Sequence, residues 1–245
     1  IINTYAIWQP KPGTTWNYVL KGYIYLRAER VEVLDVDLHK RSEEDIKNYH
    51  DADKKVICYF SGGTLEDRPD KDEFYKVEGL VNTSYNKLFG NYWLDIRKEG
   101  LKPILKERMK LAVEKKCDGI EVDNIDGYEN EDLQKTWSNP LTKQDAINFA
   151  KWLSATAHEL DFSIGLKNSL FMIDEVGDDF EFAINENCVS KKENNCYLYK
   201  NFLSKGKAVF AITYLTSLRK SLQGNNGIEN LCNILNDLNL SMIIK

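Results

Sequence analysis

The sequence lacks any long apolar run and any excess of positive charge. No stretch of the 245 residues reaches the roughly 18 consecutive apolar residues that a membrane-spanning helix requires. The 33 Lys and Arg residues are outnumbered by 38 Asp and Glu residues, which gives a formal net charge of -5. Nucleic-acid-binding domains usually carry basic patches. We therefore expect neither a membrane span nor a nucleic-acid partner.

Histidine and cysteine are both scarce. The three histidines have no spacing typical of a zinc site, so we expect no metal and no other cofactor. The five cysteines are an odd number, which leaves at least one thiol free. Cys188 and Cys196 lie close together across a predicted loop, and we expect them to form a disulfide, which implies an oxidising compartment. Cys58 and Cys232 lie in apolar runs, where small buried thiols are the simplest interpretation.

What the sequence does contain is a regular alternation of short β-branched runs with helical patterns. Several of the runs are apolar at every position, as expected for strands buried on both faces. Eight strands alternating with helices predict an α/β fold, a (β/α)8 TIM barrel, as a single domain over residues 1–245. The predicted strands are Thr4–Trp8, Val31–Val36, Lys55–Phe60, Gly119–Val122, Ser163–Leu166, Glu181–Ile184, Ala208–Ile212 and Ser241–Ile244.

Helix signals fall between these strands. Ser42 and Thr142 are good N-caps, and Pro103 fits the first turn of a helix over Ile104–Lys116. Two further helices are predicted over Cys196–Ser204 and along an apolar stripe at residues 228–238. No clear helix follows the first strand. Residues 61–92 and 124–140, which follow strands three and four, read as long loops, and loops of that length are usually functional or disordered.

Two predicted strands end in carboxylates. Gly119–Val122 is followed by Asp123, and the run after Phe180 ends in Glu186. A charged side chain has to be paired if it is buried, and otherwise has to stay in contact with water. Barrel enzymes build their sites at the carboxyl ends of the strands. We therefore predict that Asp123 and Glu186 are a pair of catalytic acids at the mouth of the barrel.

The neighbours of Asp123 have less certain roles. Side chains alternate along a strand, so Glu121 is expected one layer deeper than Asp123. Lys167 ends the next strand in the same way, and we expect it to form an ion pair with Glu121. Asp126 has three open interpretations: it binds substrate, caps the turn or holds Asp123.

Motifs along nearly the whole chain resemble those of glycoside hydrolase family 114, the endo-α-1,4-polygalactosaminidases. Three motifs are specific in combination: Asp-Asn-Ile-Asp at 123–126, Trp-Leu-Asp-Ile-Arg at 93–97 and Asn-Glu-Asn-Cys at 185–188. The others are Trp8-Gln9, Asp35-Val36-Asp37, the run 56–63 with Glu66 and Arg68, Gly165-Leu166-Lys167-Asn168, and the run 206–210.

The resemblance implies a (β/α)8 fold and cleavage within chains of α-1,4-linked galactosamine, a component of microbial exopolysaccharides and biofilm matrices. It implies Asp123 and Glu186 as the catalytic acids. Acids would attract the cationic sugar, and aromatic rings would stack on it. The substrate contacts that we expect on this basis are Trp8, Asp35, Asp37, Tyr59, Trp93, Asp95, Asn124, Asp126, Tyr128, Lys167 and Tyr214. Thr213 stands where the family often has Glu.

The expected reaction is a double displacement that retains anomeric configuration, which needs carboxyl groups about 5–5.5 Å apart, whereas about 6.5–9.5 Å favours inversion. Two alternatives stay open: a non-catalytic polysaccharide-binding barrel, and a glycosidase that acts on an acetylated or neutral sugar polymer. We expect a secreted or cell-surface monomer.

Overall fold

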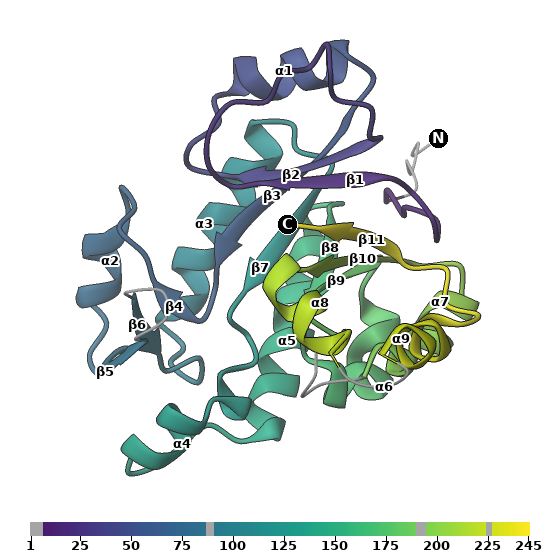
Figure 1. Ribbon diagram of the computed structural model, residues 1–245. Helices are drawn as coiled ribbons and strands as arrows, with labels where there is room; N and C mark the ends of the chain where they lie inside the picture. The colour runs from purple at the N-terminus through teal and green to yellow at the C-terminus, as the bar shows by residue number, and fades with distance from the viewer. Residues whose placement is uncertain (1–6, 87–90, 190–194, 224–226) are drawn as a thin grey trace.

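The computed structural model describes residues 7–86, 91–189, 195–223 and 227–245 (Figure 1). Eight strands form one sheet in which every pairing is parallel. Their order in the sheet is β1 (Trp16–Val19), β2 (Val33–Asp37), β3 (Lys55–Ser61), β7 (Gly119–Asp123), β8 (Ser163–Lys167), β9 (Phe182–Glu186), β10 (Ala208–Thr213) and β11 (Ser241–Ile244).

The sheet curls into a nearly closed barrel. Among the described residues no strand ladder joins β1 to β11, but the Trp16 indole N–H donates to the Ser241 carbonyl at 2.7 Å across this seam. The prediction of a (β/α)8 barrel is therefore confirmed. That the whole chain is one domain stays a prediction.

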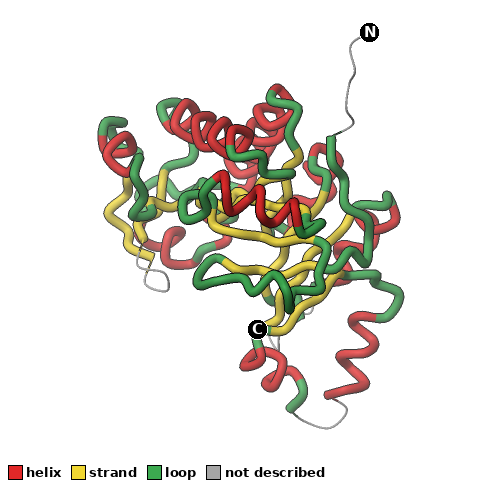
Figure 2. Tube along the Cα trace, turned by 90° about the horizontal axis from the view of Figure 1, so that it is seen from above, coloured by secondary structure: helices red, strands yellow, loops and turns green. Residues whose placement is uncertain are grey.

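Helices surround the strands, as Figure 2 shows from above. The N-caps predicted at Ser42 and Thr142 are both confirmed, each as part of a capping box, and Pro103 lies in the first turn of its helix as expected. The α-helices are α1 (Glu43–Asp51), α2 (Lys71–Tyr75), α3 (Leu101–Glu114), α4 (Glu131–Thr136), α5 (Lys143–Glu159), α6 (Ile173–Val176), α7 (Lys200–Ser204), α8 (Leu215–Ser221) and α9 (Gly227–Leu235).

The two-residue period of the strands separates two cores. Alternate side chains such as Leu34, Val56 and Ile120 point outward and pack beneath the helices. The intervening positions fill the barrel with Trp16, Val33, Ile57, Phe182, Ile184, Ala208, Phe210 and Ile212. Phe182 fits because its neighbours are glycines: a Cβ on Gly165 would lie 2.2 Å from the Phe182 ring. The lower interior is therefore apolar and filled.

The two long segments predicted as loops have structure of their own. Residues 61–86 and 91–94 contain an antiparallel sheet of β4 (Thr64–Leu65), β6 (Asn91–Leu94) and β5 (Val81–Asn86), together with α2, to one side of the barrel (Figure 1). The segment after β7 contains a 3-10 turn (Gly127–Glu129) and α4. Both connecting segments begin at the carboxyl ends of barrel strands, where such segments help to form the walls of a site.

The prediction for the first strand was wrong. Part of Thr4–Trp8 lies outside the described residues, Ile7 and Trp8 are not in a strand, and the barrel begins with Trp16–Val19. No helix follows β1 within residues 20–32. The other seven strands agree to within two residues at each end, and several extend one residue further than expected. The extra residues include Asp123 and Lys167, so these polar side chains belong to the strands themselves.

The cysteines also depart from expectation in part. The predicted Cys188–Cys196 disulfide is confirmed. Cys58 is not a free thiol but is bonded to Cys117, which ties β3 to the residue that precedes β7 by two positions. Cys232 is free but exposed, not buried, because it lies on the outer side of α9.

The Cys58–Cys117 disulfide should make a large contribution to stability. It closes a loop over a separation of 59 residues, so replacing both cysteines with alanine should lower the free energy of unfolding by about 3–4 kcal/mol, measured by chemical denaturation in oxidising buffer. Cys232→Ala is the matched control and should change it by less than about 0.5 kcal/mol. A double variant as stable as the control would contradict the bond.

Candidate active site

Three neighbouring strands end in the same local structure. Each of β7, β8 and β9 ends in a charged residue followed by an asparagine with a positive φ: Asp123–Asn124 (62°), Lys167–Asn168 (48°) and Glu186–Asn187 (66°). Asparagine tolerates this left-handed conformation better than most residues. The chain therefore turns away directly after each charged side chain, which leaves that side chain at the mouth of the barrel.

The asparagine side chains also connect adjacent strands. Asn124 Nδ2 donates to Ser61 Oγ at 2.9 Å, and Asn168 Oδ1 accepts from the Glu186 backbone N–H at 2.9 Å. The Asn168 carboxamide also donates to Asp126 Oδ2 at 3.3 Å. Asn168 therefore links the turn after Asp123 to the strand end that carries Glu186.

Two glycines hold the end of β7 against β3. The backbone N–H groups of Gly62 and Gly63 both donate to the Asp123 carbonyl, at 2.9 and 3.2 Å. A Cβ on Gly63 would lie 1.7 Å from the Asn124 carbonyl oxygen, so only glycine fits there. This close approach fixes the backbone from which the Asp123 side chain projects.

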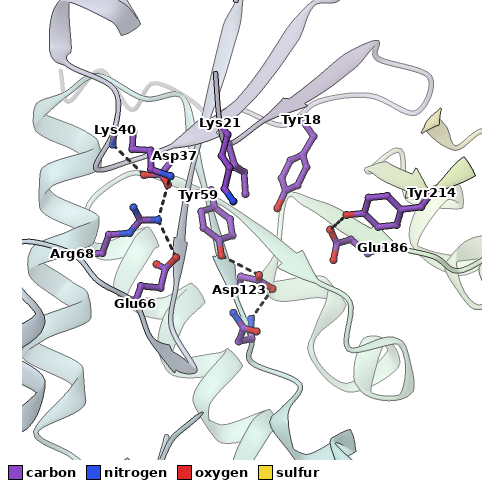
Figure 3. A pocket seen from close by; sticks show the side chains of 12 residues that line it. Tyr18, Lys21, Asp37, Lys40, Tyr59, Glu66, Arg68, Asp123, Glu186 and Tyr214 are labelled. Carbon is purple, nitrogen blue, oxygen red and sulfur yellow. Dashed lines mark hydrogen bonds and ion pairs between the residues drawn. The ribbon is translucent and has the colours of Figure 1, made fainter. Parts of the chain in front are cut away.

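A pocket of about 310 Å³ opens above these strand ends, and Figure 3 shows both predicted acids in it, Asp123 beside Tyr59 and Glu186 beside Tyr214. The residues that line it are Tyr18, Leu20, Lys21, Asp37, Lys40, Tyr59, Glu66, Arg68, Asp123, Asn124, Glu186 and Tyr214.

Asp123 is oriented by three donors. Its Oδ1 accepts from the Asn124 backbone N–H at 2.7 Å and lies 3.5 Å from the Lys167 ammonium group. Its Oδ2 accepts from the Tyr59 hydroxyl at 3.3 Å. Burial, together with the negative charge of Asp123, raises the pKa of Tyr59, so the phenol stays a neutral donor.

Glu186 has a different environment. The Tyr214 hydroxyl donates to Glu186 Oε1 at 2.8 Å. Burial and the negative charge of Glu186 raise the pKa of Tyr214, so this phenol is also neutral. Asp123 therefore directly faces a cation, whereas the side-chain contact of Glu186 is a neutral hydroxyl.

The floor of the site is a buried charge cluster. Lys167 is 1% exposed and forms an ion pair with Glu121, as predicted, while also facing Asp123. Desolvation opposes the charge on Lys167, but the carboxylates of Asp123 and Glu121 outweigh it and raise the pKa of this lysine well above its ordinary value. Asp35 is fully buried in the same cluster. Asp35 and Lys167 thus lie beneath the pocket and do not line it.

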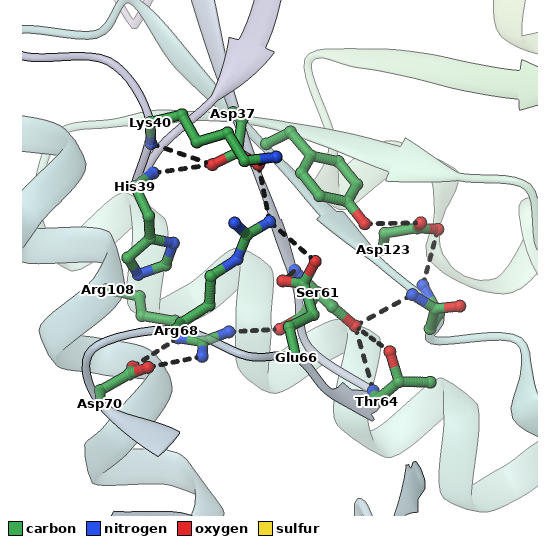
Figure 4. Close-up of polar contacts among 12 residues, drawn as sticks. Asp37, His39, Lys40, Ser61, Thr64, Glu66, Arg68, Asp70, Arg108 and Asp123 are labelled. Atoms are coloured by element: carbon green, nitrogen blue, oxygen red, sulfur yellow. Dashed lines mark hydrogen bonds and ion pairs between the residues drawn. The ribbon is translucent and has the colours of Figure 1, made fainter. Parts of the chain in front are cut away.

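One wall of the pocket is an ion-pair network (Figure 4). Arg68 Nη2 bonds Asp37 Oδ2 at 2.6 Å and Glu66 Oε1 at 3.0 Å, and Lys40 lies 3.3 Å from Asp37. Glu66 also accepts from the Ser61 backbone N–H. Since Lys21 lines the pocket as well, three cations face four carboxylates there, and the rim is less acidic than expected.

The structure places the remaining predicted residues outside the pocket. Trp8 packs on Phe182 at the amino-terminal end of the barrel, opposite the site. Trp93 is buried against Gly127, and Asp95 forms an ion pair with Arg97. Tyr128 packs against the outer core. Asp126 lies next to the pocket, where Asn168 bonds it.

Several lining residues escaped prediction from sequence. Tyr18, Leu20 and Lys21 belong to β1 and its following turn, which the misplaced first strand concealed. The β-prone run Trp16–Val19 was the available signal. Lys40 follows the expected Asp37 by three residues. Glu66 and Arg68 belong to a recognised motif, but sequence gave no sign that they fold back over the barrel mouth.

Possible cofactor sites are also informative. Within the ranges that the structure describes, no group of three or more His, Cys, Asp or Glu side chains is arranged to hold a metal ion. The pocket itself presents carboxyl, phenol, ammonium and guanidinium groups.

None of the helices in the described ranges is both long and apolar enough to cross a bilayer.

A barrel with two carboxyl groups at the ends of its strands, in one pocket, has the architecture of a glycoside hydrolase. The sequence model of glycoside-hydrolase family GH114 matches residues 3–245, and the chain belongs to this family. It is a glycoside hydrolase, which confirms the resemblance seen in its motifs.

Solved structures agree with this assignment. Aspergillus fumigatus Ega3, in a complex with galactosamine, is 33% identical, with a TM-score of 0.83 over 98% of this chain and 94% of that one. The glycoside hydrolase domain of PelA from Pseudomonas aeruginosa is 10% identical, with a TM-score of 0.68 over 96% and 94%, and shares the fold. No curated protein sequence matches the chain.

Asp126 provides a test of the electrostatics. Burial, with the negative charge of Asp123, raises the pKa of Asp126 to about 6. A carboxyl group whose pKa is higher in the folded state destabilises the fold once it ionises, so the penalty is complete above pH 6 and absent below about pH 4. Asp126→Asn should therefore raise the free energy of unfolding by about 1–2 kcal/mol at pH 7.5 and leave it nearly unchanged at pH 4.

The matched control is Asp53→Asn, because Asp53 is exposed and has a positive φ that asparagine also accepts. Denaturant unfolding of both variants at the two pH values makes the comparison. Equal effects of the two substitutions at pH 7.5 would contradict the assignment for Asp126.

Proposed function

We propose that this protein hydrolyses glycosidic bonds within galactosamine-containing polysaccharide chains, with Asp123 and Glu186 as its catalytic acids. One observation carries the proposal: β7 and β9 each deliver a carboxyl group to the same pocket. The substrate class is supported by the 33% identity to Ega3, which was crystallised in complex with galactosamine.

The proposed reaction has two displacements. In the first, an oxygen of Asp123 bonds the anomeric carbon while Glu186 gives its proton to the departing glycosidic oxygen. In the second, Glu186 takes a proton from water, the water oxygen bonds the anomeric carbon, and the bond to Asp123 breaks. Each carboxyl group returns to its starting state, and the sugar retains its configuration.

The contacts of Asp123 favour one of its oxygens as the attacking atom. Oδ1 receives the Asn124 N–H at 2.7 Å and faces Lys167. Within the described part of the chain, Oδ2 receives only the Tyr59 hydroxyl, at the longer distance of 3.3 Å. The proposal therefore assigns attack to Oδ2, while Oδ1 keeps its contacts and holds the carboxyl group in place.

The proposed roles of the two acids also follow from their surroundings. A nucleophile has to be negatively charged, and Asp123 faces the ammonium group of Lys167. Glu186, the proposed general acid, accepts from the neutral phenol of Tyr214 and forms no ion pair among the described residues. The difference between these environments supports Asp123 as nucleophile and Glu186 as acid and base.

The cations of the pocket favour a second candidate substrate. Asp37 and Glu66 are already paired with Arg68, and Lys21 adds another positive charge. An ammonium group on every sugar would find few unpaired carboxylates here, whereas an N-acetylated or neutral sugar would not need them. A glycosidase for an acetylated polymer is therefore the alternative, and a partly acetylated chain would satisfy both features.

We further propose that the protein works outside the cell as a monomer. Two disulfides within the described residues support an oxidising compartment, since such bonds are rare in reducing cytosol. A polysaccharide matrix would be encountered in that compartment.

The catalytic assignment predicts that Asp123→Asn abolishes hydrolysis without unfolding the protein. Release of reducing ends from purified polygalactosamine should fall at least about 1,000-fold, because the amide is a poor nucleophile. Asp53→Asn is the matched exposed control and should keep wild-type activity. Turnover near the wild-type rate in Asp123→Asn would exclude it as the nucleophile, and an inactive wild type would favour the non-catalytic barrel.

The two candidate substrates predict different effects of replacing Lys21. If the pocket reads the galactosamine amine, kcat/KM should be higher on fully deacetylated than on acetylated oligomers and should fall with added salt. Lys21→Met should then raise kcat/KM on the deacetylated oligomer about threefold by removing a repulsive charge. Lys151→Met, at an exposed position on α5, is the control. A preference for the acetylated oligomer, lost in Lys21→Met, would establish the alternative.

A further inference from the structure

The floor of the site contains two carboxyl groups in contact. Asp35 extends from β2 and Glu121 from β7, both are fully buried, and each of the two carboxyl groups shifts the pKa of the other. Among the described residues, neither oxygen of Asp35 nor Oε2 of Glu121 has a hydrogen-bond partner while both groups are treated as ionised. Two ionised carboxylates are both acceptors and cannot satisfy each other, whereas a proton on one of them supplies the missing donor.

The charges around this pair lead to the same requirement. Lys167 is the buried cation of the cluster, and it contacts both Glu121 and Asp123. If Asp35, Glu121 and Asp123 were all ionised, three negative charges would surround one positive charge in a site that excludes water from its floor. Such an imbalance is strongly unfavourable in a protein interior.

The contacts identify which group holds the proton. Glu121 accepts from the Lys167 ammonium group, which stabilises its ionised form. Asp35 forms no ion pair with Lys167 or with any other described cation. The proton therefore belongs to Asp35, whose hydroxyl donates to the oxygen of Glu121 that Lys167 leaves free.

We propose that Asp35 is protonated at neutral pH and is a positioning residue, which donates to Glu121 so that Lys167 remains shared with Asp123. Burial, followed by the negative charge of Glu121, raises the pKa of Asp35 well above its ordinary value, in agreement with this geometry. The charged and titratable groups that face Asp35 are Glu121, Lys167, Asp123 and Tyr18.

Asp35 affects catalysis indirectly, by changing how Lys167 is shared between Glu121 and Asp123. While Asp35 donates to Glu121, part of the negative charge of Glu121 is satisfied, and the ammonium group can also balance Asp123. Without that donor, Glu121 would draw Lys167 to itself, and the charge on Asp123 would be balanced less well. Only this step depends on the proposed function, because the location of the proton does not involve a substrate.

The proton can be located without any activity. Glu186 is the other proposed protonated acid, so the infrared comparison is made in a Glu186→Gln background at pH 7.5. There the carbonyl band of a buried protonated carboxyl group should be present, Asp35→Asn should remove it, and Asp53→Asn should keep it. Unfolding should release this proton, because an exposed aspartic acid ionises near pH 4. Between pH 5.5 and 7.5, the unfolding equilibrium constant of wild type relative to Asp35→Asn should therefore rise about tenfold per pH unit.

Two variants test the role in catalysis. Asparagine keeps a donor for Glu121, so Asp35→Asn should retain kcat/KM within about threefold and keep the acid limb of its pH profile. Leucine has a similar size but no donor, so Asp35→Leu should lower kcat about tenfold or more with little change in KM and move the acid limb to higher pH.

The outcomes are separable. An infrared band that persists in Asp35→Asn, or a relative unfolding constant independent of pH, would overturn the protonation of Asp35 even if hydrolysis is confirmed. Loss of activity in folded Asp35→Asn comparable to that of Asp123→Asn would show that Asp35 acts as a carboxylate and would overturn the proposal. Wild-type kinetics in Asp35→Leu would overturn the positioning role.

Discussion

The site depends on one buried cation. Lys167 has almost no exposed surface, and from the end of β8 it contacts the carboxylates of both Glu121 and Asp123 on the adjacent strand β7. Removing one partner from a buried ion pair is strongly destabilising, because the other charge is left uncompensated. The apolar filling of the lower barrel by Phe182 and its neighbours makes this cluster the boundary between core and pocket. The pocket is thus a polar layer built directly on a dry core, with Lys167 joining the two.

The same cluster differentiates the two acids that the pocket presents. Asp123 is held by a backbone N–H, a neutral phenol and the ammonium group below it, whereas Glu186 meets the neutral phenol of Tyr214. Paired carboxyl groups in unlike surroundings are the usual way for one fold to provide both a base and an acid at neutral pH. Tyr59 and Tyr214 have raised pKa values, so each remains a donor over the working pH range. The asymmetry resides in the surroundings, not in the types of the two acids.

Much of this could be predicted from sequence, for physical reasons. Strands that are apolar at every position indicate a sheet covered on both faces, and acids at strand ends indicate the mouth of a barrel. Alternation along β7 was enough to place Glu121 beneath Asp123 and to pair it with Lys167. The first strand was misplaced because Thr4–Trp8 and Trp16–Val19 are both β-prone, and only pairing with β2 distinguishes them. We did not predict Lys21, Glu66 and Arg68 as site residues from the sequence, because the path of a connecting segment over the barrel depends on tertiary packing. Asp35 was expected to contact the substrate. The alternation of side chains along a strand predicts which face Asp35 is on, but not how far below the mouth of the barrel it lies.

The seam between β1 and β11 has a consequence for the motions of the site. In the part of the chain that the structure describes, each of these strands has one ladder partner, whereas β7 and β9, which carry Asp123 and Glu186, are hydrogen-bonded on both sides. Backbone amides along a strand edge open locally more readily than those between two neighbours, so hydrogen exchange should be faster along the seam. Tyr18 extends from β1 into the pocket, so it would move with any local opening of the seam between β1 and β11. We therefore expect the wall that contains Tyr18 to open locally more readily than the strands that carry the two acids.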